Sequence, residues 1–312
     1  MIGLTSGSFP LLPSRCCCGI PVRLHYLFIV FLVLQVVGSI LYGGLWPLYW
    51  FLLLGPILLV TVLLHELGHS LAARQVGGRV EGILLWPLGG LAFIGHDKGP
   101  KADMWVAFAG PLMHIPMTAF WVGILIAATY IAYGTTAIQL AWPQPLTYQN
   151  LGVAVCVGAI ILNISVFAFN LLVPAYPLDG GRILVDSLLT CGVAERTTAL
   201  ITCCVAAPIA IGITIFGCVK FQVVIILIGL WILWSTWQLF DCYRKNMLAQ
   251  HPMFAFTAAQ HAASVHMTSQ PAAAPAHPVN PFAYGNAPGS YQPPVVQGYP
   301  AAQQYSPGAG RV

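Results

Sequence analysis

A histidine pair with an intervening carboxylate, His65-Glu66-Leu67-Gly68-His69, is the part of this sequence best suited to chemistry. Residues four apart on a helix share a face, so His65 and His69 can direct two imidazoles at one metal ion. Glu66 follows the first imidazole and can reach water held by that ion. This is the helical zinc-hydrolase pattern, in which the Glu acts as general base. An apolar run, Leu48 to Leu64, precedes the motif, and ionisable residues in membrane helices are costly and usually functional.

A third ligand is expected at Asp179, one of only eight acidic residues in the chain. It lies in the stretch Pro174-Ala175-Tyr176-Pro177-Leu178-Asp179-Gly180-Gly181-Arg182, where the two prolines interrupt helix. We expect Gly180-Gly181 to permit a tight turn. Broken backbone at membrane depth is tolerated only where protein or a water-filled cavity surrounds it. Asp179 is therefore a candidate ligand, and the alternative is a helix end at which Asp179 pairs with Arg182.

The two motifs together resemble the site-2 protease family of intramembrane zinc metalloproteases. Three further stretches carry the same resemblance: Ile20-Pro21-Val22-Arg23-Leu24-His25, Pro87-Leu88-Gly89-Gly90-Leu91-Ala92 and Ala109-Gly110-Pro111-Leu112. They are similar to the family's approach to its first helix, its glycine-rich strand segment and the start of its central helix. The resemblance covers roughly residues 20–187.

The resemblance implies one Zn²⁺ per chain, with His65, His69 and Asp179 as ligands and Glu66 as the catalytic base. It also implies a substrate-binding or supporting role for Gly89 and Gly90 in the strand segment. His114 stands where the family often has Asn, and Asn170 lies one residue farther from Asp179 than the family's spacing. Both are candidate supporting residues.

The composition predicts a polytopic membrane protein without reference to any motif. The 312 residues are 58% hydrophobic and 6% charged, against about 25% charged in an ordinary soluble domain. The net charge of +4 is spread out, and no basic cluster with interleaved aromatic residues occurs, so nucleic-acid binding is not expected.

We expect an all-α architecture of about six transmembrane helices, because a span needs about 20 mostly apolar residues. The candidate spans are His25–Tyr42, Leu48–Arg74, Met104–Tyr133, Leu151–Val173, Ala199–Val219 and Phe221–Phe240. With all six crossing the bilayer, one side carries Arg15, Arg23, Arg74, Arg79, Lys98, Lys101, Arg182, Arg196, Arg244 and Lys245, and the other carries Lys220 alone. This asymmetry predicts that both termini are cytosolic.

A short β-strand segment is expected between the second and third spans. Residues Val80–Pro87 and Gly89–Gly95 are apolar runs broken by Pro and Gly. An unpaired strand edge can capture an extended peptide by β-addition. The alternative is a loop that rests on the surface.

Three regions are expected: a cytosolic segment 1–24, a transmembrane metalloprotease domain 25–245, and a disordered tail 246–312 rich in Pro, Ala and Gln. Asn280-Pro281-Phe282 and Gln292-Pro293-Pro294 are candidate sites for adaptor proteins that bind the tail. Loop Gly134–Asn150 is too short for an inserted PDZ domain, and no pair of CBS domains follows the last helix. We therefore expect a minimal member of the family.

The expected function is zinc-dependent cleavage of transmembrane segments of other membrane proteins within the bilayer. Two alternatives stay open. A zinc-transporting membrane protein would also place His and Asp in its helices, but it would not need Glu66 beside His65. A catalytically silent scaffold for membrane partners would tolerate the loss of Glu66.

Overall fold

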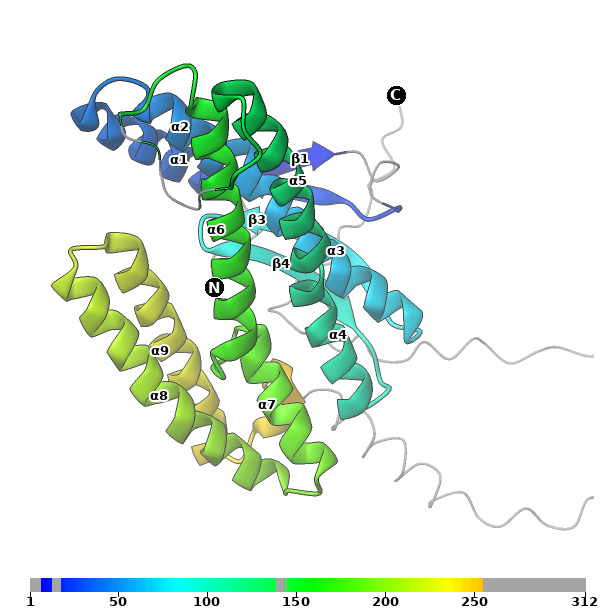
Figure 1. Cartoon of the computed structure of the whole chain (residues 1–312). Helices are drawn as coiled ribbons and strands as arrows, with labels where there is room; N and C mark the ends of the chain where they lie inside the picture. The colour runs from blue at the N-terminus through cyan, green and yellow to red at the C-terminus, as the bar shows by residue number, and fades with distance from the viewer. Residues whose placement is uncertain (1–6, 13–17, 139–142, 144, 255–312) are drawn as a thin grey trace, which may run out of the picture.

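The structure, a computed structural model, describes residues 7–12, 18–138, 143 and 145–254 (Figure 1). The α-helices are α1 (Tyr26–Ser39), α2 (Trp46–Leu52), α3 (Leu58–Gln75), α4 (Pro100–Leu112), α5 (His114–Tyr133), α6 (Leu151–Leu172), α7 (Asp179–Thr190), α8 (Glu195–Val219) and α9 (Val223–Arg244). The strands are β1 (Ser8–Leu12), β2 (Val22–His25), β3 (Arg79–Trp86) and β4 (Gly89–Gly95). The expectation of a helical membrane protein with a small strand segment is confirmed.

Within the described residues, five helical segments are long and apolar enough to cross a membrane. They are Trp46–Gln75, Pro100–Tyr133, Leu151–Leu172, Glu195–Val219 and Val223–Arg244. The remaining predicted span, His25–Tyr42, forms a shorter apolar helix, Tyr26–Tyr42. Gly43 and Gly44, both with positive φ, end it. About six spans were expected, and the difference lies in this first segment.

The two longest spans are each interrupted. Between α2 and α3, residues Leu53–Ile57 form a π-helical turn around Pro56, since proline removes a backbone donor and crowds the preceding turn. Met113 separates α4 from α5, two residues after Pro111. The second break places His114 at the first position of α5, where it faces the centre of the molecule.

The strands form a sheet in the order β1-β2-β3-β4. β3 and β4 are an antiparallel hairpin, β2 runs parallel to β3, and β1 is antiparallel to β2. The strands β3 and β4 match the predicted strand segment. However, β1 and all of β2 except His25 lie in residues 1–24, which we expected to be a cytosolic segment outside the metalloprotease domain. They belong to the folded domain because Ile20, Val22 and Leu24 are buried in its core.

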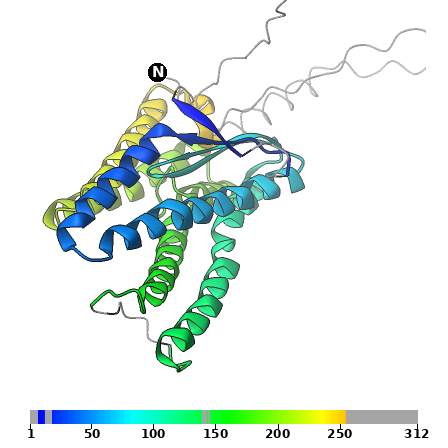
Figure 2. The same cartoon turned by 90° about the horizontal axis from the view of Figure 1, so that it is seen from above.

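One face of the sheet packs on α3, along which the strands lie (Figure 2). The buried side chains are Ile20, Val22, Leu24, Phe28, Ile83, Leu85 and Ala92, with Leu58, Leu59, Val62, Leu63 and Leu67 of α3 packed against them. The alternation of side chains along a strand brings one set of residues to this face. The sheet therefore holds β4 against the helix that carries the histidine pair.

The chain between α6 and α7 is non-helical, as its prolines predict, and α7 begins at Asp179 itself. The expected turn at Gly180-Gly181 is wrong, because both glycines lie in the first turn of α7. Because glycine has no side chain, the first turn of α7 can pack closely on the backbone that precedes it. A Cβ at Gly180 would press on the carbonyl groups of Leu171 and Val173, and one at Gly181 would press on the backbone of Ala175 and Tyr176.

The last two long helices, α8 and α9, form a hairpin beside α7 (Figure 1). The chain then continues through two short 3₁₀ turns, Leu248–Gln250 and Pro252–Phe254. Met253 and Phe254 are buried in a cluster with Val185, Ala199, Cys203 and Leu239. The expectation that the tail begins at residue 246 is therefore wrong for residues 246–254. The remainder of the expected tail, with both adaptor motifs, lies outside the described residues.

Candidate metal centre

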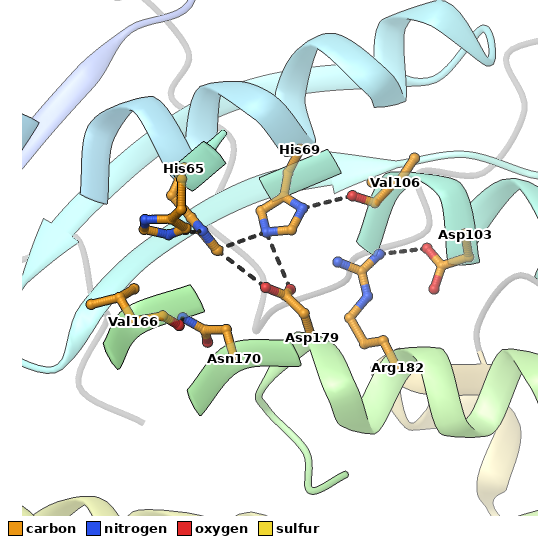
Figure 3. Close-up of polar contacts among 9 residues, drawn as sticks. His65, His69, Asp103, Val106, Val166, Asn170, Asp179 and Arg182 are labelled. Carbon is orange, nitrogen blue, oxygen red and sulfur yellow. Dashed lines mark hydrogen bonds and ion pairs between the residues drawn. The ribbon is translucent and has the colours of Figure 1, made fainter. Parts of the chain in front are cut away.

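Three of the predicted site residues meet in the interior of the protein. The Nε2 atoms of His65 and His69 are 3.1 Å apart. His65 Nε2 is 3.1 Å from Asp179 Oδ2, and His69 Nε2 is 3.2 Å from Asp179 Oδ1. All three residues are buried. Figure 3 shows the two imidazoles of α3 above the carboxylate of α7. Arg182, the alternative partner of Asp179, pairs instead with Asp103.

The proton on each imidazole can be assigned from its second nitrogen. His69 Nδ1 lies 2.7 Å from the Val106 carbonyl oxygen, which can only accept a hydrogen bond. The Nδ1 therefore carries the proton and Nε2 carries the lone pair. Metal-ligating histidines are commonly oriented by such a bond to a carbonyl.

The same assignment for His65 follows along a buried chain of hydrogen bonds. Asn163 Nδ2 donates to the Ala159 carbonyl, which leaves its Oδ1 to accept from His114 Nδ1 at 3.1 Å. A neutral His114 then accepts at Nε2 from His65 Nδ1 at 3.0 Å. His65 Nε2 is left with its lone pair. Asn163 and His114 are at most 1% exposed, so water does not compete for these bonds.

Three lone-pair donors thus face one another with no proton between them. Asp179 Oδ2 is buried and has no hydrogen bond among the described residues. Such a set is repulsive unless a cation lies at its centre. Zinc bonds of about 2.0–2.2 Å in a tetrahedron place ligand atoms about 3.3–3.6 Å apart, slightly more than the 3.1–3.2 Å between the donor atoms here. Two imidazoles and a carboxylate therefore fit Zn²⁺ and leave its fourth position open.

Electrostatics at Asp179 agree with its role as an anionic donor. Burial by itself would raise the pKa of its carboxyl group. Positive charge beside the carboxylate, which protonated His69 and His65 imidazoles would carry, outweighs burial and holds the pKa of Asp179 below its ordinary value. Since the hydrogen bonds leave both imidazoles neutral, a bound cation would supply that charge and keep the carboxylate ionised.

Glu66 lies in the same cavity as the three donors and is only 7% exposed. The backbone amide of Ala92 on β4 faces its carboxylate. Gly90 on the same strand packs directly on the side chain, since a Cβ there would lie 2.6 Å from Glu66 Oε1. Strand β4 thus sets the position of the glutamate. The neighbouring Gly89 has φ of 141°, a conformation that favours glycine.

The cavity has a volume of about 710 Å³. Its walls come from the donor residues, the first half of β4, α6 and the α8–α9 hairpin, and include Phe169, Gly212, Phe216, Ile228 and Trp231. Trp86 at the end of β3 touches Trp231 of α9, with ring centroids 5.3 Å apart. The site is therefore bounded by a sheet edge on one side and by apolar helices on the other.

Of the other predicted supporting residues, Asn170 lines the cavity, and its side chain donates to the Val166 carbonyl of its own helix at 3.1 Å. Sequence reasoning missed the Val106 carbonyl, because backbone groups leave no side-chain signal. It also missed the reason for Gly110 in the Ala109-Gly110-Pro111-Leu112 motif. A Cβ at Gly110 would overlap the His69 ring.

Comparisons with known proteins were made on the whole chain. The family model described as "Peptidase family M50" matches residues 54–210. A zinc metalloprotease of Methanocaldococcus jannaschii is 32% identical over 223 residues, which are 70% of this chain and 58% of that protein. Rip3 of Mycobacterium tuberculosis is 30% identical over 269 residues, which are 82% of this chain and 63% of that protein.

The chain therefore spans about three fifths of the length of these two relatives. Among solved structures, a site-2 protease from M. jannaschii matches with a TM-score of 0.47 and 28% identity, covering 74% of this chain and 94% of that one.

Proposed function

This chain belongs to peptidase family M50, and from that premise we propose that it is a zinc-dependent endopeptidase that cleaves transmembrane segments of other membrane proteins. One observation carries the proposal. Three proton-free donors converge on one point in a cavity that also holds the Glu66 carboxylate. Three protein ligands with a fourth position open are typical of catalytic rather than structural zinc sites.

We assign the roles as follows. His65, His69 and Asp179 hold the metal. Zinc, when bound, supplies a Lewis acid and lowers the pKa of bound water to about 7. Glu66 takes a proton from the attacking water and returns it to the leaving amine, which is general acid–base catalysis. Burial and the Ala92 amide keep the Glu66 carboxylate on the β4 side of the cavity.

The edge of β4 is the proposed binding site for an unwound substrate segment. β4 is the last strand in the sheet, and its first residues line the cavity beside Glu66. A peptide bond within a helix is shielded by the helix's own hydrogen bonds and side chains, so a substrate must be extended near the metal. Pairing with β4 would satisfy the backbone groups exposed by unwinding. Gly89 borders open space in which that segment would lie, and the absent side chain of Gly90 leaves room for Glu66.

The membrane setting supports a transmembrane substrate. The five long apolar helices make the chain an integral membrane protein, and the cavity wall opposite β4 is built mainly from apolar side chains of α6, α8 and α9. We further propose that the shorter helix Tyr26–Tyr42 crosses the bilayer together with the five long segments. Both termini then face the cytosol, because basic residues gather on one side of these six spans. Tags at the two ends, tested by protease protection in intact vesicles, should both be digested only from the cytosolic side.

Purified protein in liposomes with a single-span substrate tests the proposed activity. Cleavage should occur in the presence of zinc, disappear with a zinc chelator and return when zinc is restored. Zinc flux without any cleavage would favour a transporter, and substrate capture without cleavage would favour a scaffold. Cleavage that survives complete removal of metal would contradict the proposal.

A further inference from the structure

A second polar cluster, partly buried, lies between α4 and α7 beside the metal centre. Arg182 Nη2 donates to Asp103 Oδ1 at 2.5 Å, and His96 Nε2 lies 3.0 Å from the same oxygen. Asp186 is 1% exposed and adjoins Asp103. The catalytic chemistry uses none of these groups. Figure 3 shows Arg182 reaching from α7 to Asp103 on α4, beside the contact of His69 with Val106.

The residues of this cluster share a helix face with a metal donor. Asp179, Arg182 and Asp186 are spaced by three and four residues along α7, so their side chains project from one side of the helix. That side faces α4, on which Asp103 lies one turn before Val106. Fixing the rotation of α7 through Arg182 therefore also fixes the direction of Asp179.

Asp179 needs such an external constraint. It is the first residue of α7 and follows a non-helical stretch that starts at Val173. No preceding helical turn sets its orientation. His65 and His69, by contrast, sit within α3 and are also oriented by His114 and by the Val106 carbonyl.

We propose that the partly buried Asp103–Arg182 pair is a positioning contact that aims Asp179 at the metal. The span Pro100–Tyr133 then orients all three donors, through Val106 for His69, His114 for His65 and Asp103 for Asp179. A buried ion pair is weak evidence for stability, because desolvation offsets its attraction. The charge-assisted hydrogen bond from Arg182 Nη2 to Asp103 Oδ1 can instead define a position. This inference rests on the proposed metal site but not on the proposed proteolysis.

The test measures zinc affinity by competition with a chelator in purified full-length variants. Arg182→Gln and Asp103→Asn should each weaken zinc binding about 10- to 100-fold, the usual effect of losing an outer contact to a metal site. The double variant should bind no more weakly than either single variant, because both remove one interaction. Arg182→Lys keeps the charge but loses the planar guanidinium group, so its zinc affinity should lie between those of the parent and Arg182→Gln.

Lys245→Gln is the matched control, since it removes the exposed ion pair of Lys245 with Asp241. It should bind zinc as the parent does. The unfolding temperature of the metal-free proteins separates positioning from simple packing: a merely structural pair would change that temperature and leave zinc affinity intact.

The inference would be overturned if folded Arg182→Gln bound zinc as tightly as the parent. If Arg182→Gln fails to fold, parent-like zinc affinity in both Arg182→Lys and Asp103→Asn would overturn it. A parent chain that binds zinc but cuts no peptide would contradict the proposed function and leave this inference standing.

Discussion

Replacing Gly90 with alanine should separate the position of the base from the metal site. The added Cβ would lie 2.6 Å from Glu66 Oε1, whereas ordinary contacts begin at 3.4 Å. The carboxylate must therefore move by about 0.8 Å or more. A misplacement of about 1 Å in a catalytic group can cost on the order of 10²-fold in rate. We expect Gly90→Ala to reduce cleavage of a single-span substrate in liposomes by about two orders of magnitude.

The ligands are not touched by this change, so zinc content should remain near one ion per chain. Gly123→Ala is the matched control, because a Cβ there meets nothing within 4 Å. It should cleave at the parent rate. Parent-like cleavage by Gly90→Ala would refute the argument that β4 sets the position of Glu66, and loss of zinc would show that the substitution disturbs the ligands as well.

Three further predictions follow from the buried contacts. His114→Leu leaves His65 Nδ1 without an acceptor and should weaken zinc binding about 10- to 100-fold, whereas His114→Gln, which keeps an acceptor, should lose less in the same chelator titration. Truncation after Phe254 should preserve thermal stability. Truncation after Gln250 removes the buried His251, Met253 and Phe254 and should destabilise the protein by about 3–5 kcal/mol or more. Equal melting curves for the two truncated proteins would contradict this prediction. Burial and the Asp103 carboxylate raise the pKa of Asp186 to about 9, so its contribution to stability is complete below its unfolded pKa of about 4 and is lost as pH rises toward 9. The Asn side chain of Asp186→Asn cannot ionise, so this variant should exceed the parent in unfolding temperature by more at pH 8 than at pH 5. If the difference in unfolding temperature between variant and parent did not change with pH, Asp186 would not be a buried neutral acid.

The sequence was sufficient to single out the three side chains that the structure brings together, because their signals are local. His65 and His69 are placed on one face by helical spacing alone, and Asp179 stands out among few acidic residues beside two prolines. The strands β3 and β4 were predicted from apolar runs between glycines and prolines. These features depend on backbone geometry that a short stretch of chain determines by itself.

Long-range packing was not predictable in the same way. Nothing in the sequence near Ile20 indicates that β2 will pair in parallel with a strand about 60 residues later. Phe254 follows a run that lacks apolar periodicity, yet it is fully buried because it packs in a cluster with side chains of α7, α8 and α9. Pairings of this kind depend on the assembled helices.

The polar contacts around the site show the same limit. His114 was expected to support the site, but its contact with His65 depends on the break at Met113 that starts α5. Arg182 was considered as a possible partner of Asp179, but in the folded protein its guanidinium group pairs with Asp103 instead. Residue type therefore indicated that these side chains belong to the site. Which groups they contact depends on how α4, α5 and α7 pack together.

The central claim is that Glu66 acts as a base beside an intact zinc site, and Glu66→Gln tests it most directly. Zinc stoichiometry and substrate cleavage should be measured on the same purified sample, with His69→Ala and Asp179→Ala as variants that lose ligands. Glu66→Gln should keep about one zinc per chain and lose at least 10²-fold in cleavage, because general-base catalysis contributes about 10²–10⁴-fold. His69→Ala and Asp179→Ala should lose zinc and cleavage together. Undiminished cleavage by Glu66→Gln with zinc bound would contradict the account.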